Sequence, residues 1–248
     1  MNLIYFCIFH KSSYIELLDL LLKSLKQKGN LDKNTDLLVI THPNFVPEIK
    51  KLSSDLKIYT LTLTTLFEAC HSRLNIFSYP DISKYDKILY LDSDIIINND
   101  INLILNNNIE SNILYALEEG TIESYMFGGT FFDFTKIDKN IKAFSSGILF
   151  FKNSPQIKDL FNTIQNHIAF DHYPPVFGDQ PYFNYNAITL NMYNNTLLKQ
   201  YAVNYDLINT EHNIRKDIVI YHFSGVPGLY VYKYPKMISF FNKITPEY

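Results

Sequence analysis

Residues 85–94 read Tyr-Asp-Lys-Ile-Leu-Tyr-Leu-Asp-Ser-Asp, and this stretch decides the fold. Its apolar run, 88–91, predicts a buried strand in the centre of a sheet. The run leads directly into Asp92 and Asp94, so both carboxylates are expected at the carboxyl end of that strand, where open α/β sheets place their ligands. Two aspartates one residue apart can turn toward a common point and form an oxygen site for Mn²⁺ or Mg²⁺. Asp-x-Asp is common in surface loops, but its place after a buried strand favours a metal site that holds a diphosphate.

Strand and helix patterns alternate around this stretch. Ile15, Leu18, Leu22 and Leu25 recur at helical spacing, and Gly29 follows as a stop signal. Such alternation predicts an α/β fold with a doubly wound sheet. There is no repeat and no linker, so a single domain is expected over residues 1–248. The expected strands are 3–9, 37–41, 57–61, 88–91, 144–151 and 217–223, and the expected helices are 14–28, 47–53, 64–77, 156–168 and 181–190.

Composition narrows the classes of function. A hydrophobic fraction of 47% with 19% charged residues indicates a folded globular protein. The net charge of -3 with scattered lysines predicts that nucleic acid is not a partner. Cys7 and Cys70 are interpreted as reduced thiols, which predicts a cytoplasmic protein. The apolar start is too short to cross a bilayer, so a soluble protein is expected. Segment 230–241 mixes aromatic and basic residues; it either packs against the domain or makes a peripheral membrane contact.

A second polar constellation follows the predicted strand 217–223. His222 lies where an apolar run ends, and it either completes the metal site or is a structural histidine with an ordinary hydrogen bond. We favour the first interpretation, because an imidazole beside two carboxylates suits Mn²⁺. Gly225 would let the backbone approach a phosphate closely.

Two further segments give weaker evidence for a functional site when each is considered alone. Ser145 and Ser146 open an apolar strand, and either can cap backbone groups. Asp179 and Gln180 follow Gly178 at the start of a predicted helix, where Asp179 is a plausible N-cap.

Taken together and in this order, these segments resemble glycosyltransferase family 8, the glycogenin-like and lipopolysaccharide galactosyltransferase-like enzymes with the GT-A fold. The resemblance implies a single α/β domain with a mixed, mostly parallel central sheet flanked by helices. The resemblance covers nearly the whole chain and implies retaining transfer of a hexosyl unit from a UDP-sugar, such as UDP-glucose or UDP-galactose, to a glycan or protein acceptor. It implies a Mn²⁺ or Mg²⁺ cofactor held by Asp92, Asp94 and His222. It further implies that Arg73 contacts the diphosphate, that Asp179 and Gln180 position the donor sugar, that Tyr14 stacks on the uracil, and that Ser93, Ser145 and Gly225 complete the donor site.

Two departures from the family pattern concern catalysis. Ser145 stands where the family usually has Asn, and Gly228 stands where a lysine neutralises the leaving diphosphate. Lys233 or Lys236 would replace that lysine if the following segment folds back. These departures motivate an alternative, a catalytically weak nucleotide-sugar-binding protein of the same fold.

A haloacid dehalogenase-like phosphatase is the remaining alternative, with Asp92 as the nucleophile. Against it, residues 180–184 contain no further Asp, and the Asp-x-Asp motif does not lie near the start of the chain. The sequence leaves the donor sugar, the acceptor and a homodimeric assembly open.

Overall fold

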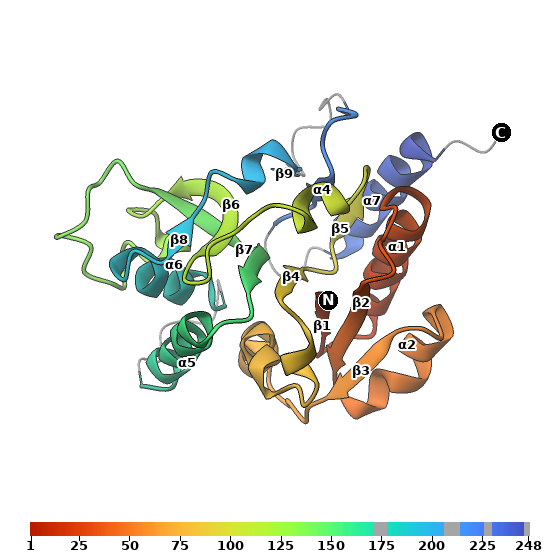
Figure 1. Cartoon of the computed structure of the whole chain (residues 1–248), viewed down its shortest axis with the longest axis horizontal. Coiled ribbons are helices and arrows are strands. Elements are labelled where there is room, and N and C mark those ends of the chain that lie inside the picture. The colour runs from red at the N-terminus through yellow and green to blue at the C-terminus, as the bar shows by residue number, and fades with distance from the viewer. Residues whose placement is uncertain (171–177, 206–213, 226–229, 246–248) are drawn as a thin grey trace.

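The computed structural model describes residues 1–170, 178–205, 214–225 and 230–245 (Figure 1). Its centre is a seven-stranded sheet with the strand order β3-β2-β1-β4-β7-β6-β8. The strands are β1 (Asn2–Ile8), β2 (Thr35–Thr41), β3 (Lys57–Thr60), β4 (Lys87–Leu91), β6 (Leu114–Thr121), β7 (Lys142–Lys152) and β8 (Tyr193–Asn194).

Most neighbouring strands of this sheet run parallel. The pairs β3-β2, β2-β1, β1-β4 and β6-β8 are parallel, whereas β7 is antiparallel to both β4 and β6. In β1, Leu3 and Tyr5 pack into one apolar cluster, whereas Ile4 and Phe6 pack into another on the opposite face. A strand buried on both faces has to be apolar throughout, which is why its sequence reads as a continuous run. The expected mixed, mostly parallel sheet is confirmed.

Helices cover both faces of the sheet. On one side α1 (Ser13–Lys28) inserts Leu18, Leu21 and Leu25 into the cluster around Ile4. On the other, α5 (Pro155–Phe170) inserts Phe161 into the cluster around Leu3. Figure 1 shows α1 and α2 to the right of the sheet and α5 and α6 to the left. The remaining α-helices are α2 (Val46–Leu52), α3 (Leu66–Cys70), α4 (Asn102–Leu105), α6 (Gln180–Thr189) and α7 (Tyr230–Ile244).

A second, three-stranded sheet lies beyond β4. It is made of β5 (Ile95–Ile97), β10 (Ile220–His222) and β9 (Ala202–Asn204), in that order. The strand expected over 217–223 is therefore shorter and belongs to this second sheet. Since β10 pairs antiparallel with β5, its residue His222 lies opposite Ile95, next to the Asp-x-Asp motif.

The helix expected over 64–77 is wrong as a single helix. Thr65 and Glu68 form a capping box that starts α3, which ends at Cys70 with His71 as its C-cap residue, and a 3-10 helix follows over Ser72–Ser78. The Ser72 hydroxyl donates to the Ala69 carbonyl oxygen at 2.7 Å. Such local hydrogen bonds offer the backbone an alternative to a continuous α-helix, and apolar periodicity does not register them.

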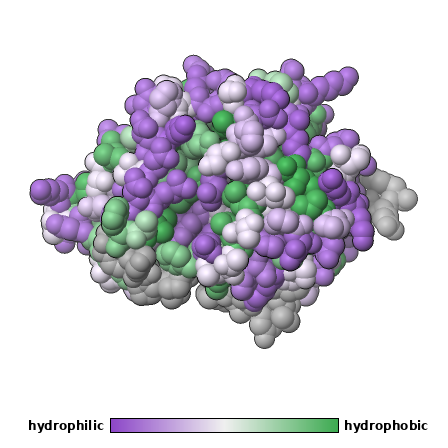
Figure 2. Space-filling model, turned by 90° about the horizontal axis from the view of Figure 1, so that it is seen from below, coloured by the Kyte–Doolittle hydropathy of each residue, from purple (hydrophilic) through white to green (hydrophobic). Residues whose placement is uncertain are grey.

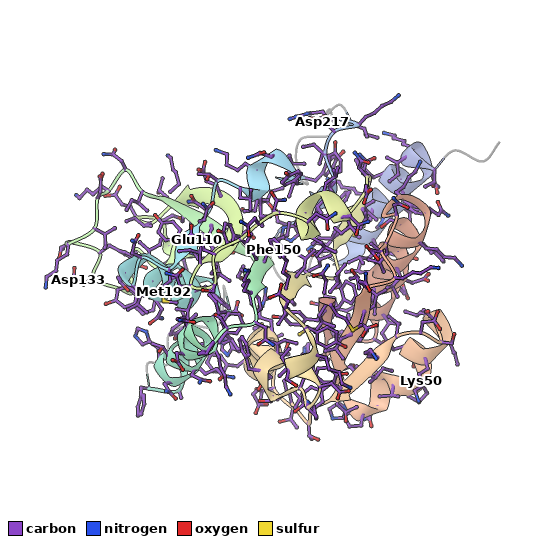
Figure 3. All side chains as sticks on the ribbon, in the orientation of Figure 1. Lys50, Glu110, Asp133, Phe150, Met192 and Asp217 are labelled. Atoms are coloured by element: carbon purple, nitrogen blue, oxygen red, sulfur yellow. The ribbon has the colours of Figure 1, made fainter. Side chains whose placement is uncertain are left out.

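The outer parts of the molecule differ in character. Figure 3 shows Phe150 near the middle of the molecule and Asp133 at its outer end, in the segment that joins β6 to β7. On the face in Figure 2, hydrophilic and hydrophobic residues are interspersed.

Helix α7 packs Met237 and Phe240 against Leu17 and Leu20 of α1, so this part of segment 230–241 contacts the domain. A membrane contact remains a prediction. Among the described helices, none has the length and apolar character needed to cross a membrane.

Candidate functional site

Asp92 and Asp94 lie in the turn between β4 and β5, and backbone hydrogen bonds hold this turn from two sides. The Asp92 amide donates to the Gly147 carbonyl oxygen on β7 at 2.9 Å. The Phe223 amide, directly after β10, donates to the Asp94 carbonyl oxygen at 2.9 Å. Both sheets therefore fix the position of the Asp-x-Asp motif.

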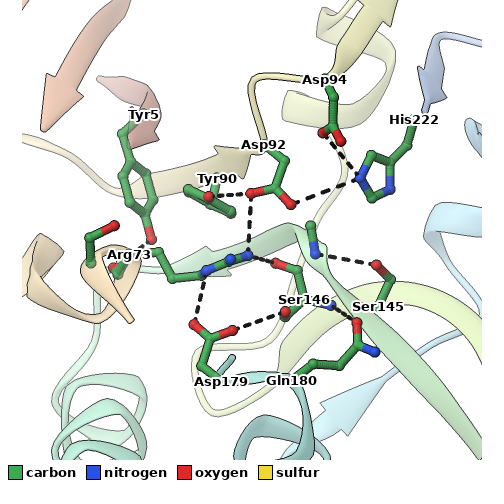
Figure 4. A network of polar contacts seen from close by, with 12 residues as sticks. Tyr5, Arg73, Tyr90, Asp92, Asp94, Ser145, Ser146, Asp179, Gln180 and His222 are labelled. Carbon is green, nitrogen blue, oxygen red and sulfur yellow. Dashed lines mark hydrogen bonds and ion pairs between the residues drawn. The ribbon is translucent and has the colours of Figure 1, made fainter. Parts of the chain in front are cut away.

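The side chains of Asp92, Asp94 and His222 converge (Figure 4). One ligand atom from each lies within 4.8 Å of the others. The His222 Nε2 atom is 3.4 Å from Asp94 Oδ1 and 3.9 Å from Asp92 Oδ2. Asp94 Oδ1 is buried, and among the described residues its one neighbouring donor atom is His222 Nε2, at the long distance of 3.4 Å. A buried carboxylate oxygen without a close donor, beside a second carboxylate and an imidazole, fits a divalent cation such as Mn²⁺.

Gly147 leaves room beside these three side chains. A Cβ atom built on it would lie 2.4 Å from His222 Cε1, 2.8 Å from His222 Nε2 and 2.9 Å from Asp92 Oδ2. These distances are too short for any side chain. The group can therefore converge only because residue 147 is glycine.

The charges within this group support one another. Burial by itself raises the pKa of Asp94, but the positive charges of Lys233 and His222 outweigh it and hold that pKa below its usual value. Burial lowers the pKa of His222, and the Asp94 carboxylate outweighs this and raises it. Asp94 is thus an ionised carboxylate at neutral pH, which is the form that binds a cation.

Lys233 joins the site from α7. Its Nζ donates to Asp94 Oδ2, and the residue is buried. Lys233 and Lys236 were both expected as possible replacements for the family's lysine. Lys233 contacts the aspartate motif, and Lys236 is half-buried. Gly228 lies outside the described residues.

Arg73 connects the Asp92, Asp94 and His222 group to a third carboxylate, that of Asp179. Its Nε lies 2.9 Å from Asp179 Oδ2 and its Nη1 lies 3.4 Å from Asp92 Oδ1 (Figure 4). The guanidinium also donates to the Ser146 carbonyl oxygen and lies over the Tyr90 ring, 4.6 Å from its centroid. Burial lowers the pKa of Arg73, but Asp179 and Asp92 outweigh it and raise that pKa well above its usual value.

Asp179 and Gln180 lie at the start of α6, next to β7. The Ser146 hydroxyl donates to Asp179 Oδ1 at 3.1 Å, and the Ser146 amide donates to Gln180 Oε1 at 3.2 Å. Gln180 Nε2 donates to the Met126 carbonyl oxygen at 3.2 Å. Burial raises the pKa of Asp179 to about 6, although Arg73 opposes this. The side chains predicted to position a sugar are thus brought into one network with Arg73.

The other predicted donor-site residues come from four different parts of the chain. Ser93 stands between the two aspartates, and the Ser145 hydroxyl accepts from the Gly147 amide at 3.3 Å. Tyr14 is in the first turn of α1; burial raises the pKa of its phenol, and the nearby Lys233 opposes this. Gly225 is exposed beyond β10. Their predicted roles remain predictions.

Sequence reasoning missed three supporting side chains. The Tyr90 hydroxyl donates to Asp92 Oδ1, and Asn204 Oδ1 lies 2.8 Å from His222 Nδ1. Asn184 accepts from the Phe144 amide and donates to its carbonyl oxygen, both at 2.9 Å, which holds the start of β7. Only Tyr90 had a signal in the sequence, because residues two apart along an extended segment point to the same side.

Comparisons with known proteins bear on the family and the fold. The sequence profile described as Glycosyl transferase family 8 matches residues 9–227. The galactosyltransferase LgtC, solved in complex with donor and acceptor sugar analogs, is similar in structure with a TM-score of 0.65 and 14% identity over 100% of this chain and 98% of that one. The apo structure of the bifunctional glycosyltransferase WbbM gives a TM-score of 0.66 and 15% identity over 98% of this chain, which spans 50% of the WbbM chain. Comparison with curated proteins gives no match. The expected GT-A fold is confirmed.

Proposed function

This chain belongs to glycosyl transferase family 8, and on that premise we propose that it is a metal-dependent, retaining glycosyltransferase that moves a hexosyl unit from a UDP-sugar to a glycan or protein acceptor. One observation carries the proposal. Asp92 is one of the three converging side chains, with Asp94 and His222. It also lies beside Arg73, which pairs with Asp179. A cation site for a diphosphate therefore adjoins side chains suited to a sugar, as a nucleotide-sugar donor requires. The complex of LgtC with donor and acceptor sugar analogs supports the same assignment.

Positive charge is what the reaction needs at the diphosphate. Breaking the bond between sugar and phosphate leaves negative charge on the nucleoside diphosphate. Mn²⁺ or Mg²⁺ held by Asp92, Asp94 and His222 would supply Lewis acid stabilisation of that charge. The Arg73 side chain lies beside this group, is only 12% exposed and stays protonated, so it offers a second cation.

Lys233 supplies a third positive charge in this proposal. It replaces the lysine that the family pattern places at Gly228, because its Nζ reaches Asp94 from α7. Substitution of Lys233 by Met should therefore reduce turnover of the donor more than it reduces donor binding, whereas Lys236→Met should leave both near the wild-type values.

The sugar-positioning residues are Asp179 and Gln180. Asp179 is 1% exposed and paired with Arg73. A carboxylate held in this way is poorly placed to act as a nucleophile, so we assign it to fixing Arg73 and the sugar ring. The preferred route to retention is attack from the face of the leaving group, with Tyr14, Ser93, Ser145 and Gly225 holding the rest of the donor.

A catalytically weak nucleotide-sugar-binding protein remains the second candidate. The observation that favours it is Ser145, which stands where the family has Asn. The Ser145 side chain is shorter than that of asparagine, and its hydroxyl already accepts a hydrogen bond from the Gly147 amide. The family match favours a transferase over a phosphatase.

A panel of nucleotide sugars separates the two candidates. We expect Mn²⁺-dependent hydrolysis of one UDP-sugar by the wild type and its loss in Asp92→Asn and His222→Ala. Asp133→Asn, a change at the outer end of the molecule (Figure 3), is the control and should retain full activity. Metal-dependent binding without turnover, also with candidate acceptors present, would favour the second candidate, and no binding of any nucleotide sugar would refute both.

A further inference from the structure

His222 has two ring nitrogens with different surroundings. Nε2 faces Asp94 Oδ1 and Asp92 Oδ2 at 3.4 and 3.9 Å, whereas Nδ1 lies 2.8 Å from Asn204 Oδ1. The residue is only 3% exposed, so its ring is held by protein atoms on both sides. A neutral imidazole carries a proton on one nitrogen and a lone pair on the other. The hydrogen-bond partners of the two nitrogens decide which of them carries the proton.

The backbone brings Asn204 to this nitrogen. Strands β9 and β10 are parallel, and Asn204 is the register partner of His222. Side chains of paired residues in neighbouring strands point to the same face of the sheet. Just beyond the strand, the Tyr205 amide donates to the His222 carbonyl oxygen at 2.6 Å, which holds this register at its end. The contact between the two side chains therefore follows from the sheet.

We propose that Asn204 is a positioning residue for the metal site: its amide oxygen accepts the Nδ1 proton of His222 and so leaves the Nε2 lone pair aimed at the space between Asp92 and Asp94. The inference rests on the proposed metal site. An amide oxygen can only accept a hydrogen bond, so it selects the tautomer protonated at Nδ1. Groups that orient a metal-binding histidine in this way typically change metal affinity 10–100-fold when they are removed, which is on the order of what we expect here.

The choice of an amide has its own consequence. The site already contains two carboxylates, and Asn204 orients the imidazole without adding a third negative charge. An aspartate at position 204 would keep the acceptor and add charge, which makes the imidazole a stronger ligand. Asn204→Asp should therefore keep or tighten metal binding, whereas Asn204→Leu, of similar size but without an acceptor, should weaken it.

Mn²⁺ titration followed by the electron paramagnetic resonance signal of the free ion tests this. We expect Asn204→Leu to raise the Kd for Mn²⁺ by about 10- to 100-fold and Asn204→Asp to leave it unchanged or lower. Asn195→Leu is the matched control, because Asn195 is a buried asparagine whose amide donates to the Lys142 carbonyl oxygen at 2.8 Å, away from the metal group. This variant should lose stability but keep the wild-type Kd. Equal Kd values for Asn204→Leu and wild type would overturn the proposal.

Nitrogen-15 NMR of the histidine rings gives a readout that does not need the metal. At alkaline pH, where the imidazole is neutral, the wild type and Asn204→Asp should show His222 protonated at Nδ1, and Asn204→Leu should show a substantial population protonated at Nε2. Protonation at Nε2 in the wild type would overturn the proposal. If the wild type shows the Nδ1 tautomer but binds no Mn²⁺, the proposed function fails while the role of Asn204 in orienting His222 stands.

Discussion

Gly147 shows, at the scale of single residues, that the space around the ligands matters as much as the ligands. It lies on β7, next to the residue that pairs with the last residue of β4, and its carbonyl oxygen accepts a hydrogen bond from the Asp92 amide. Any side chain here would occupy the volume that His222 and Asp92 require. The same position would be unremarkable in a strand without a site.

Substitution of Gly147 by Ala should disrupt the metal site more than the fold. The new methyl group would overlap His222 and Asp92, so both would have to move, and overpacking of this kind costs about 1–3 kcal/mol of stability. We expect Mn²⁺ affinity, measured by isothermal titration calorimetry, to fall at least tenfold. Unchanged affinity would show that the three side chains do not converge as described.

Arg73 and Asp179 provide a prediction about buried charge. Removing one member of a buried ion pair leaves the other unpaired and costs about 3–5 kcal/mol, whereas removing both costs less. Arg73→Met should therefore be strongly destabilised in urea unfolding, and the double variant Arg73→Met/Asp179→Asn should recover part of that loss. Simple addition of the two single effects would contradict the pairing.

At the scale of elements, the junction between α3 and the 3-10 helix positions Arg73. His71 is the C-cap residue of α3, and its buried side chain makes edge contacts with the rings of Phe67 and Tyr182. Because α3 stops there, the chain turns and Arg73 enters the site, where the Tyr5 hydroxyl donates to its carbonyl oxygen at 3.0 Å. The short second sheet plays the corresponding role for His222.

His71 makes this junction sensitive to acid. Burial lowers its pKa to about 4, although a hydrogen bond with the Gly178 backbone opposes this. The unfolded chain takes up the proton near pH 6.5 and the folded protein only near 4, so stability is lost as the pH falls through this window, by up to about 3 kcal/mol. Urea midpoints measured from pH 7 to pH 4 should fall less steeply in His71→Phe than in the wild type, and parallel curves would contradict this assignment.

The sequence predicted the elements whose signal is local. The continuous apolar runs of β1 and β4 and the helical spacing in α1 are visible without knowledge of partners. Strands β5 and β9 have three residues each, and such short segments become strands through pairing with distant parts of the chain. The convergence of Asp92, Asp94 and His222 could be predicted because each lies at or just beyond the end of an apolar strand. Asn204 could not be predicted, because a single hydrogen-bonding side chain leaves no pattern.

At the scale of the whole molecule, the two ends of the chain pack together. Met237 and Phe240 of α7 lie in one apolar cluster with Leu17 and Leu20 of α1 and with Ile218 before β10. The same α7 carries Lys233 to the site. We propose on this ground that residues 1–248 form a single domain that unfolds as one unit.

Met237→Ala tests whether the domain unfolds as one unit. The side chain is fully buried, so its truncation should cost about 2–5 kcal/mol. Circular dichroism and tyrosine fluorescence should report one coincident unfolding transition in both proteins, shifted to lower urea in the variant, with Leu103→Ala, whose side chain is 47% exposed, as the control. Two separated transitions would contradict a single domain.

The central claim is that Asp92, Asp94 and His222 hold a divalent cation that binds the donor's diphosphate. Crystals grown with Mn²⁺ and UDP, with diffraction data collected at the manganese absorption edge, test it most directly. We predict one strong anomalous peak within coordination distance, roughly 2–2.5 Å, of all three side chains and of the diphosphate oxygens. A peak at other residues, or UDP bound without any ion at this group, would contradict the account.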